Sequence, residues 1–179
     1  MRREEKMVAA LLAHGADANA PLQTWTPTRR SSDDWNFAPE LVGATPFWLA
    51  ARFVQPGVMR LLLKYGADPK FVHHGDRMVE GRGEAFRHRL DVTTALMAAT
   101  GMGGGRAWVL PARSERERLT LEAVKLAVEL GIDINAANTD ERTALDGAAD
   151  LKYESVVSYL VEHGAKGTGK PGPPIRVPN

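Results

Sequence analysis

The sequence predicts an all-α solenoid in which antiparallel pairs of helices stack side by side. The first observation behind this prediction is a phrase that ends four apolar runs, Gly-Ala-Asp or a close variant of it, at residues 11–20, 61–70, 126–136 and 159–167. The second is a shared opening, Thr followed by apolar and Ala residues, at residues 44–51, 93–100 and 142–149. A chain that repeats one short unit forms an array in which each unit packs on its neighbours.

The spacing of these phrases is the third observation. Thr45 and Gly66 are 21 positions apart, as are Thr143 and Gly164. Gly131 precedes Gly164 by 33 positions. A fixed period of this size indicates a structural repeat. One helix pair cannot bury its own apolar face but a stack of pairs can, which explains why the unit recurs.

Each unit carries the start and stop signals of two helices. Thr45 is suited to cap the first helix of its unit, and Pro46 stands at the first helical position. The apolar stripe at residues 58–63 is wide enough for a second helix that faces a core. Gly66 then follows where a left-handed residue ends a helix, and glycines occupy the same place at positions 15, 131 and 164.

These patterns resemble the ankyrin repeat family. The family's unit opens G-x-T-P-L-H-x-A-A and closes L-L-L-x-x-G-A-D-x-N, and residues 43–68 match it with little deviation. The resemblance covers most of residues 7–167. It implies helix pairs joined by hairpin fingers, in a scaffold or interaction module that binds a protein or peptide and performs no catalysis. The family's histidine is replaced by Trp48, Met97 and Asp146, so we expect weaker polar bonding between repeats.

The period divides the chain into an N-terminal half and three full repeats. Residues 1–20 hold an outer helix only, and the full repeats are residues 43–70, 93–136 and 137–167. Residues 168–179 are rich in Pro and Gly, and we expect a disordered tail that folding does not require.

The half-repeat leaves an apolar face without its inner helix. We expect Val8, Leu11 and Leu12 to lie on that face, and either a missing upstream segment or self-association to cover it. An alternative function follows from this expectation. The chain would then be the C-terminal targeting or regulatory module of a longer enzyme or effector.

Three insertions interrupt the period, at residues 21–42, 71–92 and 101–118. The first two fall between repeats and should lengthen fingers along one edge, whereas the third falls inside a repeat. The second insertion has balanced charges, and we expect a short helix from Glu84 to Leu90. The third ends in residues that lengthen the next outer helix, with Ser114 as the expected N-cap.

Aromatic residues gather in the insertions, and tryptophan is enriched at binding hot spots. A long ordered loop also needs aromatic side chains to pack it onto its scaffold, so both interpretations stand. We expect Trp48 to be mainly structural and at least one of Trp25 and Trp35 to be needed for binding. The candidate surface is the concave face and finger edge, including the loop from Arg77 to Arg89. The candidate partner-binding residues are Trp25, Trp35, Phe37, Trp48, Arg52, Arg77, Arg82 and Met97.

Composition and motifs argue against other functions. The formal net charge is +1 and no basic stripe appears, so we expect no nucleic acid partner. The chain has no cysteine. Residues 164–170 approach a phosphate-binding loop, but Pro171 stands where that loop needs a hydroxyl group. His73, His74 and His88 lack the spacing of a metal site, and we expect them on the surface.

We therefore expect no cofactor, no metal and no catalytic residue. No apolar run approaches the roughly 18 residues of a membrane-spanning helix, so we expect no membrane contact. The N-terminal apolar stretch leads directly into a repeat glycine and does not resemble a signal peptide. The cytoplasm is the default expectation for the compartment.

Overall fold

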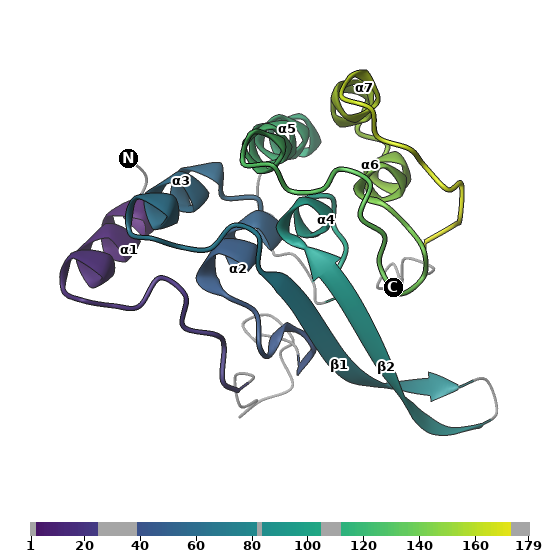
Figure 1. Ribbon diagram of the computed structural model, residues 1–179, viewed down its shortest axis with the longest axis horizontal. Helices are drawn as coiled ribbons and strands as arrows, with labels where there is room; N and C mark the ends of the chain where they lie inside the picture. Colours follow the sequence, from purple (N-terminus) through teal and green to yellow (C-terminus); the bar gives the residue numbers. More distant parts are fainter. Residues whose placement is uncertain (1–2, 25–38, 82–83, 105–111, 173–179) are drawn as a thin grey trace.

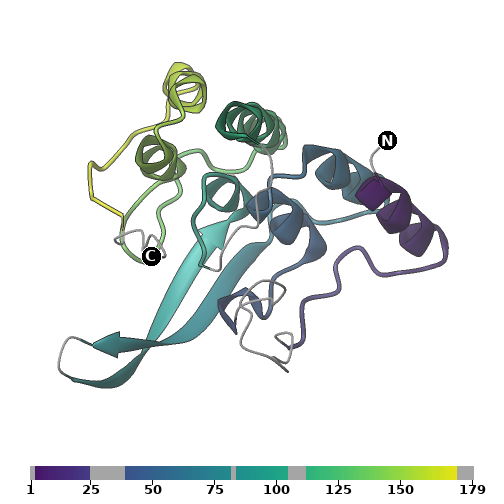
Figure 2. The same cartoon turned by 180° about the vertical axis from the view of Figure 1, so that it is seen from behind.

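The computed structural model describes residues 3–24, 39–81, 84–104 and 112–172, and it arranges the helices in two layers (Figures 1 and 2). The outer layer holds α1 (Arg3–Ala13), α3 (Pro56–Lys64), α5 (Arg113–Glu129) and α7 (Glu154–Glu162). The inner layer holds α2 (Pro46–Arg52), α4 (Ala95–Ala99) and α6 (Ala144–Leu151), and a 3-10 turn, η2 (Pro39–Leu41), precedes α2. Every helix contacts the next one in its layer, and the predicted helical repeat fold is confirmed.

The predicted helix signals act as the sequence indicates. The side chain of Thr45 accepts a hydrogen bond from Trp48 N at 3.4 Å, and Thr94 caps α4 in the same way through Met97 N at 3.3 Å. Gly66 has a φ of 82°, which suits glycine at a helix end. The corresponding glycines at positions 15, 131 and 164 have φ of 91°, 72° and 85°.

The core lies between the two layers and combines small with large side chains. The buried alanines of the inner helices are Ala50, Ala51, Ala95, Ala98, Ala99, Ala144 and Ala148. They let neighbouring helices approach closely, and Phe47, Trp48 and Met59 fill the space between repeats. Burying one such large side chain stabilises the fold by about 1.5–3 kcal/mol.

The second insertion forms a β-hairpin, so the expectation of an all-α chain is wrong there. Strands β1 (Val72–Gly81) and β2 (Glu84–Thr94) pair antiparallel and project away from the helices (Figure 1). The short helix expected from Glu84 to Leu90 is wrong for the same reason. Apart from His88, apolar and charged residues alternate along residues 86–92, and this period of two favours a strand over a helix.

The base of the hairpin is fixed on α2 by Trp48. Its indole Nε1 donates a hydrogen bond to the carbonyl oxygen of Thr93 at 3.2 Å, and its ring lies 4.4 Å from the ring of His73. His73 Nε2 is 3.0 Å from the carbonyl oxygen of Val42. His73 is buried, so its expected surface position is wrong. The expected weakness of polar bonding between repeats is also wrong at Trp48, because the bond to Thr93 joins two repeats.

Asparagine side chains connect successive fingers. Asn19 Oδ1 accepts a hydrogen bond from Asp68 N at 2.8 Å, and Asn19 Nδ2 donates to the carbonyl oxygen of Gly66 at 2.9 Å. Asn135, just before the last repeat, makes the same two bonds with Gly164 and Lys166. At the junction between them, Lys70 takes the place of the asparagine. Its ammonium group has no oxygen that could accept the backbone hydrogen bond.

Helix α1 packs on α3 and exposes only part of its apolar face. Leu12 is buried, so the expectation that it is exposed is wrong, and Val8 is half-buried against the core. Leu11 is 57% exposed and Met7 63%.

Helix α5 has 17 residues, against nine in α3 and nine in α7, which confirms the predicted lengthening. Ser114 does not cap it, because the helix begins at Arg113 after Ala112. Glu117 instead accepts hydrogen bonds from the backbone and hydroxyl of Ser155, at the start of α7. The longer helix thereby supports the next repeat.

Burial of His73 predicts that stability falls in mild acid. Burial lowers the pKa of His73 below 6.5, and the Val42 hydrogen bond opposes this effect. Within the described ranges, His73 Nδ1 is buried without a hydrogen-bond partner, so a proton added there is not stabilised. The unfolded chain takes up the proton near pH 6.5, whereas the folded chain does so only at lower pH. The stability that the fold has while His73 is neutral is therefore fully present above pH 6.5 and is lost as the pH falls below that value.

Thermal unfolding of the wild type and His73→Gln at pH 7.5 and pH 5.5 measures this effect. We expect the melting temperature of the wild type to fall more than that of His73→Gln, because the other histidines are common to both. Equal decreases would show that His73 does not couple protonation to folding.

Candidate functional site

A cleft of about 220 Å³ opens beside the inner helices, between the hairpin and the last repeat. We call it the finger cleft. Its polar side chains come from α2, β2, α6 and the finger at residues 137–142, and a glycine-rich turn after α4 completes the lining. The charged and amide residues that line it are Arg52, Arg89, Asp91, Asn138, Asp140, Arg142 and Asp150.

Arg52 lies at the end of α2 and is 6% exposed. Its Nε donates a hydrogen bond to the carbonyl oxygen of Gly104 at 3.0 Å. Burial lowers the pKa of Arg52 to about 10, although the nearby charge of Glu40 acts to raise it. The guanidinium therefore stays charged at neutral pH and ties α2 to the glycine-rich turn.

Polar contacts fasten β2 to the next finger. Arg89 forms an ion pair with Asp140. Two bonds lie nearer the base of the hairpin. Val92 N donates to Thr139 Oγ1 at 3.1 Å, and Asn138 Nδ2 is 3.5 Å from Asp91 Oδ1. These contacts hold one wall of the finger cleft against the other.

The glycine-rich turn lets the floor of the cleft approach Trp48 closely. Gly101, Gly103 and Gly104 all have positive φ, as expected for a helix stop followed by a turn. A Cβ atom on Gly103 would lie 2.5 Å from the Trp48 ring. The same tryptophan thus positions the hairpin base and the floor of the cleft.

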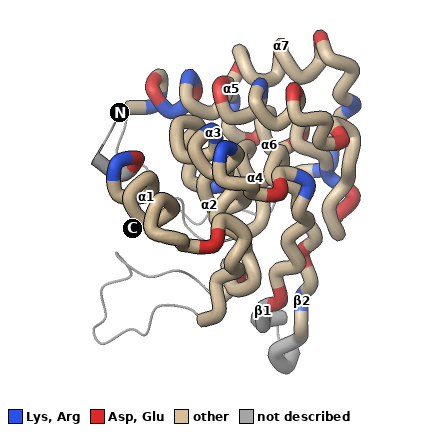
Figure 3. The backbone as a smooth tube through the Cα atoms, turned by 60° about the vertical axis from the view of Figure 1, so that its left-hand side comes forward, with Lys and Arg blue, Asp and Glu red and all other residues tan. Residues whose placement is uncertain are grey.

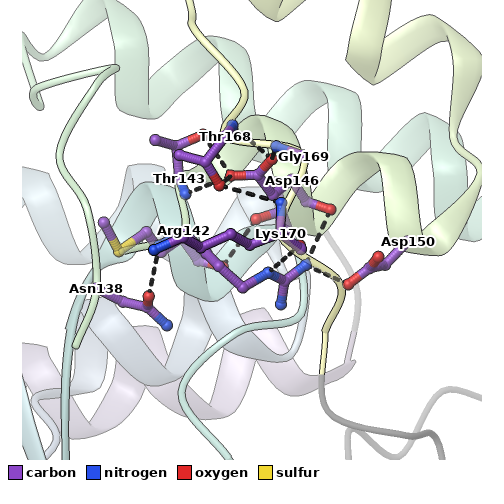
Figure 4. A network of polar contacts seen from close by, with 10 residues as sticks. Asn138, Arg142, Thr143, Asp146, Asp150, Thr168, Gly169 and Lys170 are labelled. Carbon is purple, nitrogen blue, oxygen red and sulfur yellow. Dashed lines mark hydrogen bonds and ion pairs between the residues drawn. The ribbon is translucent and has the colours of Figure 1, made fainter. Parts of the chain in front are cut away.

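At the last repeat, Arg142 and Asp146 form a polar network (Figure 4). Arg142 pairs with Asp150 and donates to the carbonyl oxygen of Asp146 at 3.3 Å. Asp146 Oδ2 accepts a hydrogen bond from Thr143 N at 2.8 Å, which completes a capping box at the start of α6.

Residues 168–172 dock on this network, so the expectation of a disordered tail is wrong for them. Asp146 Oδ1 accepts hydrogen bonds from Thr168 N at 2.9 Å and Gly169 N at 3.0 Å. Arg142 Nε donates to the carbonyl oxygen of Lys170 at 3.0 Å, and the Lys170 ammonium pairs with Glu141. We call residues 168–172 the strap. The rest of the expected tail, residues 173–179, lies outside the described residues.

Burial of Asp146 acts to raise its pKa, but the hydrogen bonds it accepts prevail. The backbone of Thr143 and the amides and hydroxyl of the strap lower the pKa of Asp146 below its usual value. The carboxylate is therefore ionised at neutral pH and suited to hold amide donors.

Residues 42–74 match the family model for the ankyrin repeat. The chain therefore contains an ankyrin repeat. In addition, a stretch of 46 residues is 39% identical to alpha-latrotoxin-Lhe1a of Latrodectus hesperus. That stretch is 26% of this chain and 3% of the toxin's length. Ankyrin repeats are protein-interaction modules and are typically not catalytic, so the chain carries a protein-interaction module.

Three of the binding residues predicted from the ankyrin pattern are not free surface residues. Trp48 and Met97 are buried in the core, and Arg52 lines the finger cleft but is itself buried. The backbone of Arg77 lies opposite Arg89 in the strand register of the hairpin, and the side chain of Arg77 lies outside what the structure describes. Trp25, Trp35, Phe37 and Arg82 lie outside the described residues, and their role in binding stays a prediction.

Sequence reasoning included Arg89 only as the end of the candidate loop, and it missed three other charged residues of the finger cleft. They are Asp140, Arg142 and Asp150. A usable signal was present for Arg142, which immediately precedes the Thr that opens the last repeat. Arg89 gave no such signal, because its partner Asp140 is 51 positions away.

The described ranges give two further observations. They contain no group of three or more His, Cys, Asp or Glu side chains placed to hold a metal ion. None of the helices they include is long and apolar enough to cross a membrane.

Docking of the strap predicts that residues 168–172 contribute to stability. Deleting residues 168–179 leaves Asp146 Oδ1 without its two amide donors, and we expect the free energy of unfolding to fall by about 1–2 kcal/mol. Urea denaturation measures the change. Deleting residues 173–179 alone is the matched control, because it keeps the strap. Equal stability of the two truncated chains would contradict a stabilising strap.

Proposed function

We propose that the chain binds an extended segment of a partner protein in the finger cleft, without catalysing a reaction. The observation that carries this proposal is the cleft itself, in which charged side chains of four separate elements face a common space of about 220 Å³. Ankyrin repeats present binding surfaces of this kind beside their inner helices and fingers. The lengthened hairpin extends that surface outward.

The charges of the finger cleft indicate the chemistry of the partner. Three arginines and three aspartates line it, and two of the arginines are paired, Arg89 with Asp140 and Arg142 with Asp150. Both signs are also interspersed along the rest of the described backbone (Figure 3). A polar segment with both acidic and basic side chains suits such a surface better than a polyanion does.

Pairing also makes the cleft a specific surface. A partner side chain that approaches Arg89 competes with Asp140 for it, so only a segment with acids and bases in the right order keeps every charge satisfied. A segment with the wrong order leaves a charge desolvated and unpaired, which costs affinity.

A second candidate function is that of a targeting or regulatory module in a longer enzyme or effector, whose catalytic part would precede these residues. The observation that favours it is the exposed apolar surface of α1, where Met7 and Leu11 are 63% and 57% exposed. A preceding repeat would pack there as α1 packs on α3. In this second candidate, the partner segment still binds in the finger cleft.

A displayed library of random peptides, selected on the wild-type chain, provides ligands with which to test the finger cleft. We expect the selected peptides to bind Arg89→Ala or Asp140→Ala about tenfold more weakly than the wild type or worse, because either substitution unpairs a cleft charge. Isothermal titration calorimetry measures the affinities.

Arg60→Ala is the matched control, since Arg60 lies in an outer helix and is 3.8 Å from its acidic partner Glu122. It should leave the affinity unchanged. If all three variants bind the selected peptides as the wild type does, the ligands bind elsewhere and the proposal fails.

A further inference from the structure

The strap is held by groups whose positions do not depend on it. Asp146 Oδ2 is fixed by Thr143 N at 2.8 Å and Thr143 Oγ1 at 3.2 Å. The guanidinium of Arg142 is fixed by Asp150 and by the carbonyl oxygen of Asp146. The receptor groups are therefore ordered before any segment docks, which favours binding.

One oxygen of this site, Asp146 Oδ1, is bonded by the strap. Among the described residues, the hydrogen bonds to Asp146 Oδ1 come from the strap, through Thr168 N and Gly169 N. Asp146 is 6% exposed, and a buried carboxylate oxygen needs hydrogen-bond donors. The site thus requires two consecutive backbone amides from whatever segment fills it.

Other contacts define which residues the segment carries. The Thr168 hydroxyl donates to Asp146 Oδ2 at 3.0 Å, so the first residue has a hydroxyl group. The ammonium of Lys170 pairs with Glu141, so the third is basic.

The second position of the segment requires glycine. Gly169 has a φ of 70°, which an L-residue with a side chain rarely adopts. A Cβ atom on Gly172 would meet only the ends of the Asp150 and Arg142 side chains, which can move aside, so the fifth position does not require glycine.

We propose that Glu141, Arg142, Asp146 and Asp150 form a peptide-recognition site for the motif Ser/Thr-Gly-Lys/Arg. The chain fills this site in cis with its own Thr168-Gly169-Lys170-Pro171-Gly172. The site takes the same motif from a partner chain when the strap is displaced. Arg142 and Asp150 also line the finger cleft, but binding of this motif requires no ligand in that cleft.

The tether makes the strap a strong competitor, because a short linker gives an effective concentration on the order of millimolar. An external motif therefore binds appreciably only when the strap is weakened or when a partner gains further contacts. The strap thus acts as the chain's own competitive inhibitor at this site.

The test uses the full chain with the strap released. Gly169→Pro removes one amide donor to Asp146 and cannot adopt the left-handed backbone. Thr168→Pro releases the strap independently, because it removes the other amide donor to Asp146 Oδ1 and the hydroxyl donor to Asp146 Oδ2. In both variants we expect the NMR signals of residues 168–172 to move to random-coil positions, and the Thr143 amide signal to shift. A synthetic peptide of residues 165–172 should then restore the wild-type Thr143 signal.

A peptide series tests the motif on the released chains. The peptide with D-alanine in place of Gly169 should bind as well as the native one, because a D-residue favours positive φ. The Gly169→Ala peptide should bind about tenfold more weakly, and the Gly169→Pro peptide should not bind. The wild-type chain, with its strap docked, should bind the native peptide at least about tenfold more weakly than the released chains.

Three results would overturn the proposal. The first is a strap that keeps its wild-type signals in both variants. The second is a released chain whose Thr143 signal does not respond to millimolar native peptide. The third is equal binding of the D-alanine, Ala and Pro peptides, which would show that the site does not recognise the motif. Each result is independent of whether library peptides bind the finger cleft.

Discussion

The architecture beyond the helices depends on the packing of Trp48. This side chain is fully buried at the start of an inner helix, and it contacts three separate segments there. Its indole donates to Thr93 in β2, its ring packs at a tilt against His73 in β1, and Gly103 lies against the ring edge. A two-stranded hairpin is marginally stable by itself in water. Anchoring both strands on one buried ring gives this hairpin a fixed base and therefore a fixed direction.

Polar contacts then build the surface on that frame. The ion pair between Arg89 and Asp140 joins the hairpin to the last finger, and Arg142 joins that finger to α6. The Arg89–Asp140 pair is partly exposed, and exposed ion pairs contribute about 0–1 kcal/mol each, so this pair orients side chains more than it holds the fold. The Arg142 guanidinium is buried, so its pairing with Asp150 also satisfies a buried charge. This separation of roles suits an interaction module. The apolar core fixes the scaffold, and the polar pairs at the surface can exchange their contacts for contacts with a partner.

Much of the repeat scaffold was predictable from sequence, because local signals specify it. The cap at Thr45 and the left-handed Gly66 follow from spacing and residue type. The hairpin was also predictable from the period of two along residues 86–92, whereas the balanced charges of this segment do not distinguish a strand from a helix. The finger cleft and the strap were not predictable. They depend on contacts between distant residues, such as Arg89 with Asp140 and Thr168 with Asp146, whose geometry the insertions set.

Amide hydrogen exchange on Trp48→Phe tests the central role of Trp48 most directly. Phenylalanine keeps an apolar ring but loses the Nε1 donor to Thr93 and part of the contact with Gly103. We predict faster exchange at residues 72–75, 91–94 and 101–104, with protection retained in α5 and α7, which Trp48 does not join. Unchanged exchange at those three segments, or a uniform loss of protection across all helices, would contradict the claim that Trp48 positions the hairpin and the cleft.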